Sequence, residues 1–233
     1  MTTVIPIHSY LKKLKVLGHG NGGTIYQVRY KRTSVIYAHK VVNGDCDTTI
    51  RIFYEMKILH HMDSPFIIKC HEIFEKPSGD ISILMEYMDA SSLDTLPKSH
   101  GILLELSLSP IACQVLHGLN YLHFQKIVHG DIKPANLLVN QNMEVCMSRT
   151  LEHCHSYVGT CAYMSLEGLK LSPIIGGSNR PSSGLTIMEL YVGHFPLLCL
   201  AQKPEWATLM CAICLEEPPS LLESASEQFS ELH

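Results

Sequence analysis

The chain has 233 residues, of which 46% are hydrophobic and 17% charged, and its formal net charge is −4 at pH 7. This length can bury a sizeable core, either in one large domain or in two small lobes. The charge balance gives no general electrostatic reason to bind nucleic acid or an anionic membrane. The longest near-continuous apolar run covers residues 195–201, far short of the roughly 20 residues that span a bilayer.

Cysteine usage and the first residues indicate a reducing compartment. The nine Cys are an odd number, scattered without the pattern of a small disulfide scaffold, so we expect free thiols. Residues 1–17 contain no apolar core followed by a cleavage site, so they do not resemble a secretion signal. We therefore expect a cytoplasmic or nuclear protein.

Short β-prone runs, separated by turns, dominate the first 88 residues. They predict antiparallel strands over residues 10–17, 24–30, 35–42, 66–74 and 81–88. Between residues 50 and 61 the apolar side chains instead recur at steps of three and four, which predicts one amphipathic helix. After residue 89 the pattern becomes helical, most clearly over residues 109–123. The Gly-, Ser- and Pro-rich segment 176–184 is expected to be a loop.

Gly18, Gly20 and Gly23 form a G-x-G-x-x-G pattern. In a dinucleotide-binding fold such a loop opens a helix, but here a β-like run follows from Thr24 to Val28. That order favours a glycine-rich hairpin whose backbone N–H groups approach nucleotide phosphates. A plain glycine turn without a ligand is the alternative.

A Lys and a Glu follow the glycines at suggestive places. Lys40 lies near the end of a predicted strand, and Glu55 lies in the predicted helix. Each alone would be read as a surface charge. After a glycine loop, however, their order suits a phosphate clamp in which the Lys neutralises the α- and β-phosphates and the Glu holds the Lys.

The strongest signal is the stretch from Ile127 to Val139, in which Asp131, Lys133 and Asn136 precede an apolar run. An Asp can orient and deprotonate a hydroxyl group, and a Lys can stabilise a transferring phosphoryl group. An Asn amide oxygen can bind a metal ion. These three residue types at this spacing therefore predict a phosphoryl-transfer loop.

This stretch resembles the H-R-D-x-K-x-x-N catalytic loop of protein kinases, with Gly130 in place of the Arg. The resemblance extends from about residue 12 to the C-terminus. Residues 84–88 resemble the hinge that holds adenine, and residues 156–165 are similar to the segment after the activation loop of MAP kinase kinases. Because Thr150 and Ser156 match the phosphosite spacing of the plant branch, the chain is identified as similar to a plant-type MAP kinase kinase.

The resemblance implies an α+β, two-lobed protein kinase-like fold with a β-rich N-lobe, one regulatory helix and a mainly helical C-lobe. The lobes are expected at residues 1–88 and 89–233, together forming one kinase domain. Asp131, Lys133, Lys40 and Glu55 would be catalytic, and Asn136 would bind Mg²⁺. The residues implied for binding ATP are Leu17, Gly18, Gly20, Gly23, Ile25, Ala38, Lys40, Glu86, Met88 and Leu138. A MAP kinase would be the substrate and a MAP kinase kinase kinase the activator, acting on Thr150 and Ser156.

The sequence departs from the family in its second half. All seven Asp lie at or before Asp131, so the D-F-G motif, whose Asp holds Mg²⁺, is missing. Glu144 and Glu152 are the nearby carboxylates, and neither is expected to replace it. Gly130 removes the Arg that would bind a phosphorylated activation loop, residues 179–184 replace the D-x-W-S-x-G motif, and Leu166 stands where the A-P-E-like motif has Pro. The chain also ends before the family's last helices, so we expect an incomplete C-lobe.

Two functions therefore compete. One is an ATP-dependent MAP kinase kinase of impaired activity, based on the intact first half of the catalytic set. The other is a catalytically inactive pseudokinase or interaction module, based on the missing Asp. A third possibility is a misassembled coding sequence between residues 140 and 185, which transcript sequencing would reveal.

Overall fold

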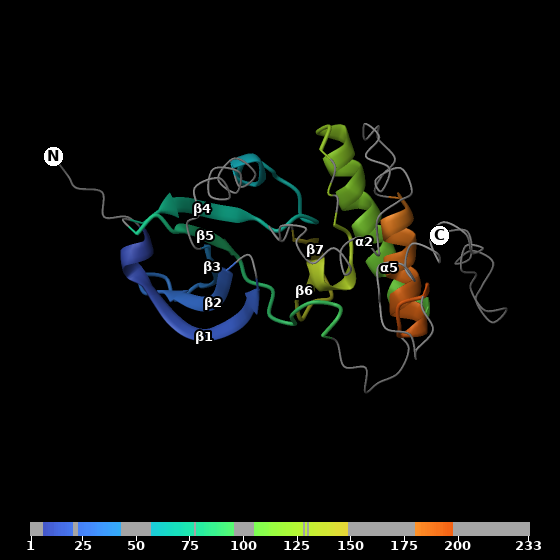
Figure 1. Cartoon of the computed structure of the whole chain (residues 1–233), viewed down its shortest axis with the longest axis horizontal. Coiled ribbons are helices and arrows are strands. Elements are labelled where there is room, and N and C mark those ends of the chain that lie inside the picture. The colour runs from blue at the N-terminus through green and yellow to red at the C-terminus, as the bar shows by residue number, and fades with distance from the viewer. Residues whose placement is uncertain are drawn as a thin grey trace. The chain divides into compact units, whose positions relative to one another are not determined.

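The computed structural model describes eight parts of the chain (Figure 1): residues 7–20, 23–42, 57–76, 78–95, 105–127, 129, 131–148 and 180–197. The described residues fall into two compact units, one ending at Asp89 and the other beginning at Ala90. A β-sheet organises the first unit, and helices with a small sheet organise the second. No described helix has the length and apolar character needed to cross a membrane.

The first unit is built on one antiparallel sheet of five strands in the order β1-β2-β3-β5-β4. Its strands are β1 (Leu11–Gly20), β2 (Gly23–Tyr30), β3 (Ile36–Val42), β4 (Cys70–Glu75) and β5 (Ile81–Glu86), preceded by the 3-10 turn η1 (Ile7–Tyr10). All five predicted strands are therefore confirmed, although the fourth begins at Cys70 rather than at residue 66. The register places β3 between β2 and β5, in the interior of the sheet.

One face of this sheet carries a cluster of buried apolar side chains. Val42, Cys70, Ile81 and Ile83 are buried against one another, and Leu59 packs on this cluster from outside the sheet. Residues 57–60 are helical, as the predicted helix over 50–61 requires, while residues 50–56 lie outside the described parts. Burial of side chains of this size contributes about 1.5–3 kcal/mol each, so the cluster ties the helical segment to the sheet.

The second unit contains the helices α2 (Glu105–Phe124) and α5 (Arg180–Val192). Between them lie the 3-10 turn η3 (Pro134–Asn136) and a two-stranded sheet of β6 (Leu137–Val139) and β7 (Val145–Met147). The helix predicted over 109–123 is confirmed within α2, because its apolar stripe is buried as expected: Ile111, Val115, Leu119 and Leu122.

A helical side chain braces the β6–β7 hairpin. The Oε1 atom of Gln114, on α2, accepts a 2.8 Å hydrogen bond from the backbone N–H of Val145. Its Nε2 atom donates to the carbonyl of Met143 at 3.2 Å. The hairpin is also extended by residues 90–93, since the N–H groups of Ala90 and Leu93 donate to the carbonyls of Val139 and Leu137. The short strands are thus held on both sides.

The expectation of a loop over 176–184 is wrong for its described part, because α5 begins at Arg180. Pro181 lies in the first turn, where a missing N–H removes no intrahelical hydrogen bond. Ser183, Thr186 and Ile187 are buried, so tertiary packing outweighs the low helix propensity of Gly and Ser. Residues 176–179, and residues 198–233 at the end of the predicted C-lobe, lie outside the described residues.

Candidate active site

The glycine pattern lies at a strand-to-strand turn. Gly20 ends β1 and pairs with Gly23, which starts β2, as the predicted hairpin requires and unlike the strand-to-helix turn of a dinucleotide-binding fold. Gly23 has a φ of +106°, and a Cβ there would lie 2.0 Å from the carbonyl oxygen of Val41. Only glycine fits that position. A Cβ on Gly18 would meet nothing within 4 Å, so Gly18 leaves open space beside the backbone.

Side chains of the two hairpin strands flank this turn. Leu17 is exposed, and Ile25 is half-buried. The ring Nδ1 of His19 and the hydroxyl of Thr24 form a 3.1 Å hydrogen bond across the hairpin, which fixes the two strands next to the glycines. The structure therefore places Leu17, Gly18, Gly20, Gly23 and Ile25 on one hairpin.

Lys40 lies in the interior of the sheet rather than at an edge. It pairs with Ile25 on β2 and with Ile83 on β5, and it is 6% exposed. Ala38, two residues earlier and therefore on the same face, is also buried. A buried lysine is rare unless its charge is paired, so the interpretation of Lys40 as a solvated surface charge is wrong. Its expected partner, Glu55, lies outside the described residues.

The predicted hinge continues from β5. The N–H of Glu86 donates to the carbonyl of Lys69 at 2.9 Å, and Met88 is buried at 6% exposure. Nearby, burial and then the charge of Lys69 lower the pKa of His71. Both effects favour the neutral imidazole of His71.

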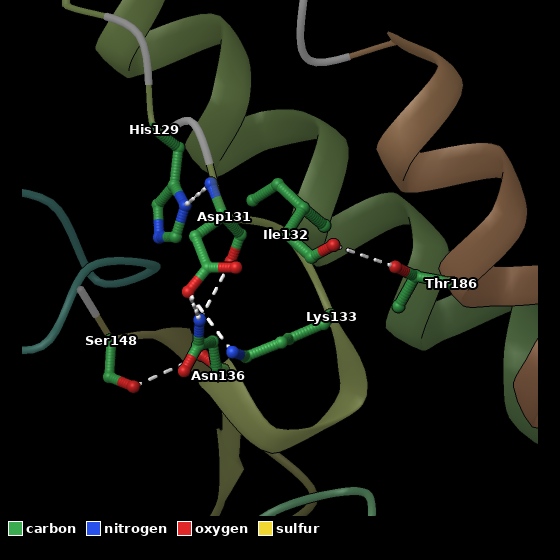
Figure 2. A network of polar contacts seen from close by, with 7 residues as sticks. All are labelled: His129, Asp131, Ile132, Lys133, Asn136, Ser148 and Thr186. Atoms are coloured by element: carbon green, nitrogen blue, oxygen red, sulfur yellow. Dashed lines mark hydrogen bonds and ion pairs between the residues drawn. The ribbon is translucent and has the colours of Figure 1, made fainter. Parts of the chain in front are cut away.

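In the second unit, the side chains of Lys133 and Asn136 converge on the carboxylate of Asp131 (Figure 2). Asn136 Nδ2 donates to the Oδ2 atom of Asp131 at 2.8 Å and to its backbone carbonyl at 2.7 Å. The ammonium of Lys133 lies 3.3 Å from the same Oδ2 atom. The Asn136 amide and the Lys133 ammonium therefore hold the same carboxylate oxygen of Asp131 in place. The three residues selected from the sequence are thus brought together as a site that can accept a proton next to a cation.

The geometry of the surrounding loop explains this convergence. Lys133 is extended, and Pro134 starts the turn η3, so that the chain reverses and Asn136 faces Asp131. The N–H of Asp131 donates to the Nδ1 atom of buried His129 at 3.3 Å. Beyond the turn, the N–H of Ser148 donates to the carbonyl of Asn136 at 2.8 Å. The predicted catalytic loop is therefore held at both ends by hydrogen bonds.

A further anchor comes from α5, and sequence reasoning missed it. The hydroxyl of Thr186 donates to the carbonyl of Ile132 at 3.1 Å, as Figure 2 shows. Both residues are buried. A threonine within a helix carries no sequence signal for such a contact, because the two residues are 54 positions apart.

Leu138, the last of the predicted ATP-binding residues, is half-buried in β6. It pairs with Cys146 on β7 and forms a bridge with Ser92 on its other side. Its position two residues after Asn136 places it beside the catalytic loop, within the second unit.

The resemblance implies Mg²⁺, and the residues fit this ion only in part. Asn136 uses both amide hydrogens on Asp131, so its Oδ1 atom is the one that could bind a cation. Glu144 instead accepts a hydrogen bond from Asn140 in the β6–β7 turn, at the opposite end of β6 from Asn136. No Asp follows Asp131, and within the described residues no three His, Cys, Asp or Glu could hold a metal. The described residues therefore offer Asn136 as a ligand for Mg²⁺, but they lack the carboxylate that would accompany it.

The predicted phosphorylation sites, Thr150 and Ser156, lie outside the described residues, as does Glu152. The predicted site residues that the structure describes therefore form two separate groups, one within each unit. The first unit supplies the glycine hairpin, Lys40 and the hinge, and the second supplies the catalytic loop with Leu138.

Comparison with known proteins supports the resemblance to protein kinases. The model of the protein kinase domain matches residues 11–232. Mitogen-activated protein kinase kinase 9 of Arabidopsis thaliana is 53% identical over 237 residues, covering 94% of this chain and 75% of that protein. Mitogen-activated protein kinase kinase 7 of the same plant is 47% identical over 95% of this chain and 76% of its own length. The chain therefore belongs to the protein kinases, and within them to the plant-type MAP kinase kinases.

Proposed function

We propose that this chain transfers the γ-phosphoryl group of ATP to Ser, Thr or Tyr side chains of a MAP kinase, at a reduced rate. The observation that carries the proposal is the convergence of Lys133 and Asn136 on the Asp131 carboxylate. An oriented carboxylate beside a cation is what a kinase needs in order to receive the proton of the attacking hydroxyl group.

In the proposed reaction the substrate hydroxyl oxygen forms a bond to the γ-phosphorus, and the bond to the β–γ bridging oxygen breaks. The hydroxyl proton passes to Asp131, and ADP leaves. Lys133 stabilises charge on the phosphoryl oxygens, while Lys40 neutralises the α- and β-phosphates. Bound Mg²⁺ supplies further charge neutralisation in this family.

The reduced rate follows from the donor set. Asn136 supplies one metal ligand, and no Asp follows Asp131 in the chain. Electrostatic stabilisation of the developing charge is commonly the largest contribution to phosphoryl transfer. A chain that supplies fewer carboxylates for the metal than a kinase with the D-F-G motif should therefore retain the reaction but perform it slowly.

Transfer of radiolabelled phosphate from ATP to an inactive MAP kinase tests the proposal. We expect incorporation by this chain, and none by Asp131→Asn, which keeps the side chain's size but cannot accept the proton. Equal incorporation by the two proteins would contradict it.

A pseudokinase or interaction module in MAP kinase signalling is the second candidate, favoured by the absence of any Asp after Asp131. Such a protein would bind ATP without turnover. Its mark would be thermal stabilisation by ATP that Mg²⁺ does not increase, together with phosphate incorporation no greater than that of Asp131→Asn.

For partners, we propose a MAP kinase as substrate and a MAP kinase kinase kinase as activator, acting on Thr150 and Ser156 in the cytoplasm or nucleus. The names of the plant relatives support the first part. Because Gly130 replaces an Arg, phosphorylation at these residues lacks one charge partner in the catalytic loop. We expect a weaker activating effect of phosphorylation than in a kinase that has the Arg.

A further inference from the structure

Basic side chains are concentrated at the start of the chain. Residues 1–44 contain seven Lys and Arg and no Asp or Glu, so the rest of the chain holds 11 Lys and Arg against all 22 acids. A net charge of −4 therefore combines a strongly basic segment with a strongly acidic remainder. The strands β1, β2 and β3 all lie in the basic segment.

Six of these seven cations are exposed and form what we call the basic hairpin surface: Lys12, Lys13, Lys15, Arg29, Lys31 and Arg32. None of the six has an ion-pair partner in the described part of the chain. Lys12 and Arg29 are directly paired across β1 and β2, and like charges in that arrangement destabilise a sheet. An anion bound here would relieve this repulsion.

Two of the cations are already held in place by aromatic rings. The ammonium of Lys13 lies 3.6 Å from the centroid of the Tyr26 ring, and the guanidinium of Arg32 lies 5.2 Å from that of Tyr10. Such contacts fix the position of a cation without neutralising its charge. The basic hairpin surface is therefore partly ordered before any partner binds.

Nucleotide phosphates do not account for this surface. Gly20 and Gly23 pair at one end of the β1–β2 hairpin, and Lys12 pairs with Arg29 near the other end. The eight residue-to-residue steps from Lys12 to Gly20 span about 26 Å of strand. Arg29, Lys31 and Arg32 thus lie far from the glycine turn, so they require a separate explanation.

The strand β1 also offers backbone and apolar groups. It is the edge of the described sheet, and Leu14, Val16 and Leu17 on it are 39–47% exposed. Lysines on an edge strand commonly prevent unwanted strand pairing, which would explain Lys12, Lys13 and Lys15. It does not explain the cations on β2 and on the turn that follows it, whereas a bound acidic strand uses the whole set.

We propose that the basic hairpin surface binds an extended acidic segment of a partner protein, which pairs with β1 as an added strand. Its carboxylates would meet the cations, and apolar side chains between them would cover Leu14 and Val16. A bilayer or a nucleic acid would use the charges but not the backbone of the edge strand, so a peptide fits more of the observed features. The proposal does not depend on phosphoryl transfer.

Fluorescence anisotropy of a labelled peptide of alternating Glu and Val, titrated with the full chain, tests this. We expect Lys12→Glu combined with Arg29→Glu to weaken binding by about tenfold or more. The matched control is Lys69→Glu with Lys126→Glu, which changes the net charge equally at exposed lysines outside the surface and should leave affinity within about twofold. A peptide N-methylated at alternate residues, which cannot pair as a strand, should bind weakly.

Several outcomes would overturn the proposal: no binding of the peptide by the unmodified chain, equal affinities for the two double variants, or unchanged binding of the N-methylated peptide. Vesicles containing one quarter phosphatidylserine and a single-stranded DNA oligonucleotide serve as competing ligands. Tighter binding of either than of the peptide would assign the surface to that class instead. Lys12→Glu alone creates an opposite-charge pair with Arg29, so it should not lower the melting temperature. It provides a variant of the surface that remains folded.

Discussion

The hydroxyl of Thr186 donates a 3.1 Å hydrogen bond to the backbone carbonyl of Ile132, and both residues are buried. Ile132 lies between Asp131 and Lys133, so this one bond connects helix α5 to the centre of the catalytic loop. A buried carbonyl without a donor costs about 1–3 kcal/mol. The contact therefore both stabilises the second unit and restrains the residue next to the proposed proton acceptor.

Replacing Thr186 by Val keeps its shape and removes the hydroxyl group. We expect Thr186→Val to lower the free energy of unfolding by about 1–3 kcal/mol, and to lower the rate of phosphate transfer more than it raises the KM for ATP. Thr186→Ser, which keeps the donor, should lose less of both. Urea denaturation and steady-state kinetics measure these effects, and equal losses in the two variants would contradict a role for the hydroxyl group.

Folding stability requires glycine at position 23 but not at position 18. Because Gly23 has a φ of +106° and a Cβ there would clash with the carbonyl of Val41, we expect Gly23→Ala to lower the free energy of unfolding by more than about 1 kcal/mol. Gly18→Ala meets no atom within 4 Å and should change stability by less than about 0.5 kcal/mol. Thermal denaturation compares the two variants. Equal melting temperatures would contradict the backbone conformation described for Gly23.

Asn136 holds Asp131 through two hydrogen bonds. We expect Asn136→Ala to cost about 1–3 kcal/mol of stability and to remove phosphate transfer, because the carboxylate loses its orientation. Asn142→Ala is the matched control, since Asn142 is exposed in the β6–β7 turn and donates its hydrogen bond to Asn140 through its backbone N–H. An Asn136→Ala protein as active as the control would contradict this role of Asn136.

Cysteine reactivity provides a test that depends on pH. Burial raises the pKa of the Cys70 thiol to about 11, partly offset by a backbone hydrogen bond at Glu72. Since Cys113 is exposed, iodoacetamide at pH 8 should alkylate Cys113 first and Cys70 only after unfolding. Mass spectrometry of the modified peptides measures the order.

The same raised pKa has a consequence for stability. The unfolded chain loses the Cys70 proton at a lower pH than the folded chain does, so the contribution of Cys70 to stability is complete below the ordinary thiol pKa and is lost as the pH rises towards 11. Cys70→Ala should remove this part of the alkaline destabilisation. An unchanged pH dependence in Cys70→Ala would contradict burial of the thiol.

The sheet of the first unit could be predicted because its signals are local. Alternating or β-branched runs bounded by glycines and turn residues define each strand, and the glycine pattern predicted a hairpin because a β-like run follows it. The start of α5 was missed because its first turn contains Pro, Ser and Gly, which are typical of loops. Burial of Ser183 and Thr186 decides that segment, and burial is not visible in the local sequence.

The residues of the candidate site also differ in whether the local sequence predicts them. Asp131, Lys133 and Asn136 lie within six residues of one another, so their spacing predicted that a single loop carries all three. Gln114, which braces the β6–β7 hairpin, and Thr186, which anchors Ile132, act over 31 and 54 positions of sequence. Contacts of that range follow from helix packing, for which Gln and Thr carry no distinctive pattern.

Calorimetric titration of the full chain with ATP, with and without Mg²⁺, tests whether a loop that retains Asp131, Lys133 and Asn136 binds ATP with reduced help from the metal ion. We expect ATP to bind and Mg²⁺ to raise the affinity by no more than about tenfold, because Asn136 is the metal ligand that the described residues supply. A strengthening of more than about a hundredfold by Mg²⁺, or no binding of ATP under either condition, would contradict this expectation.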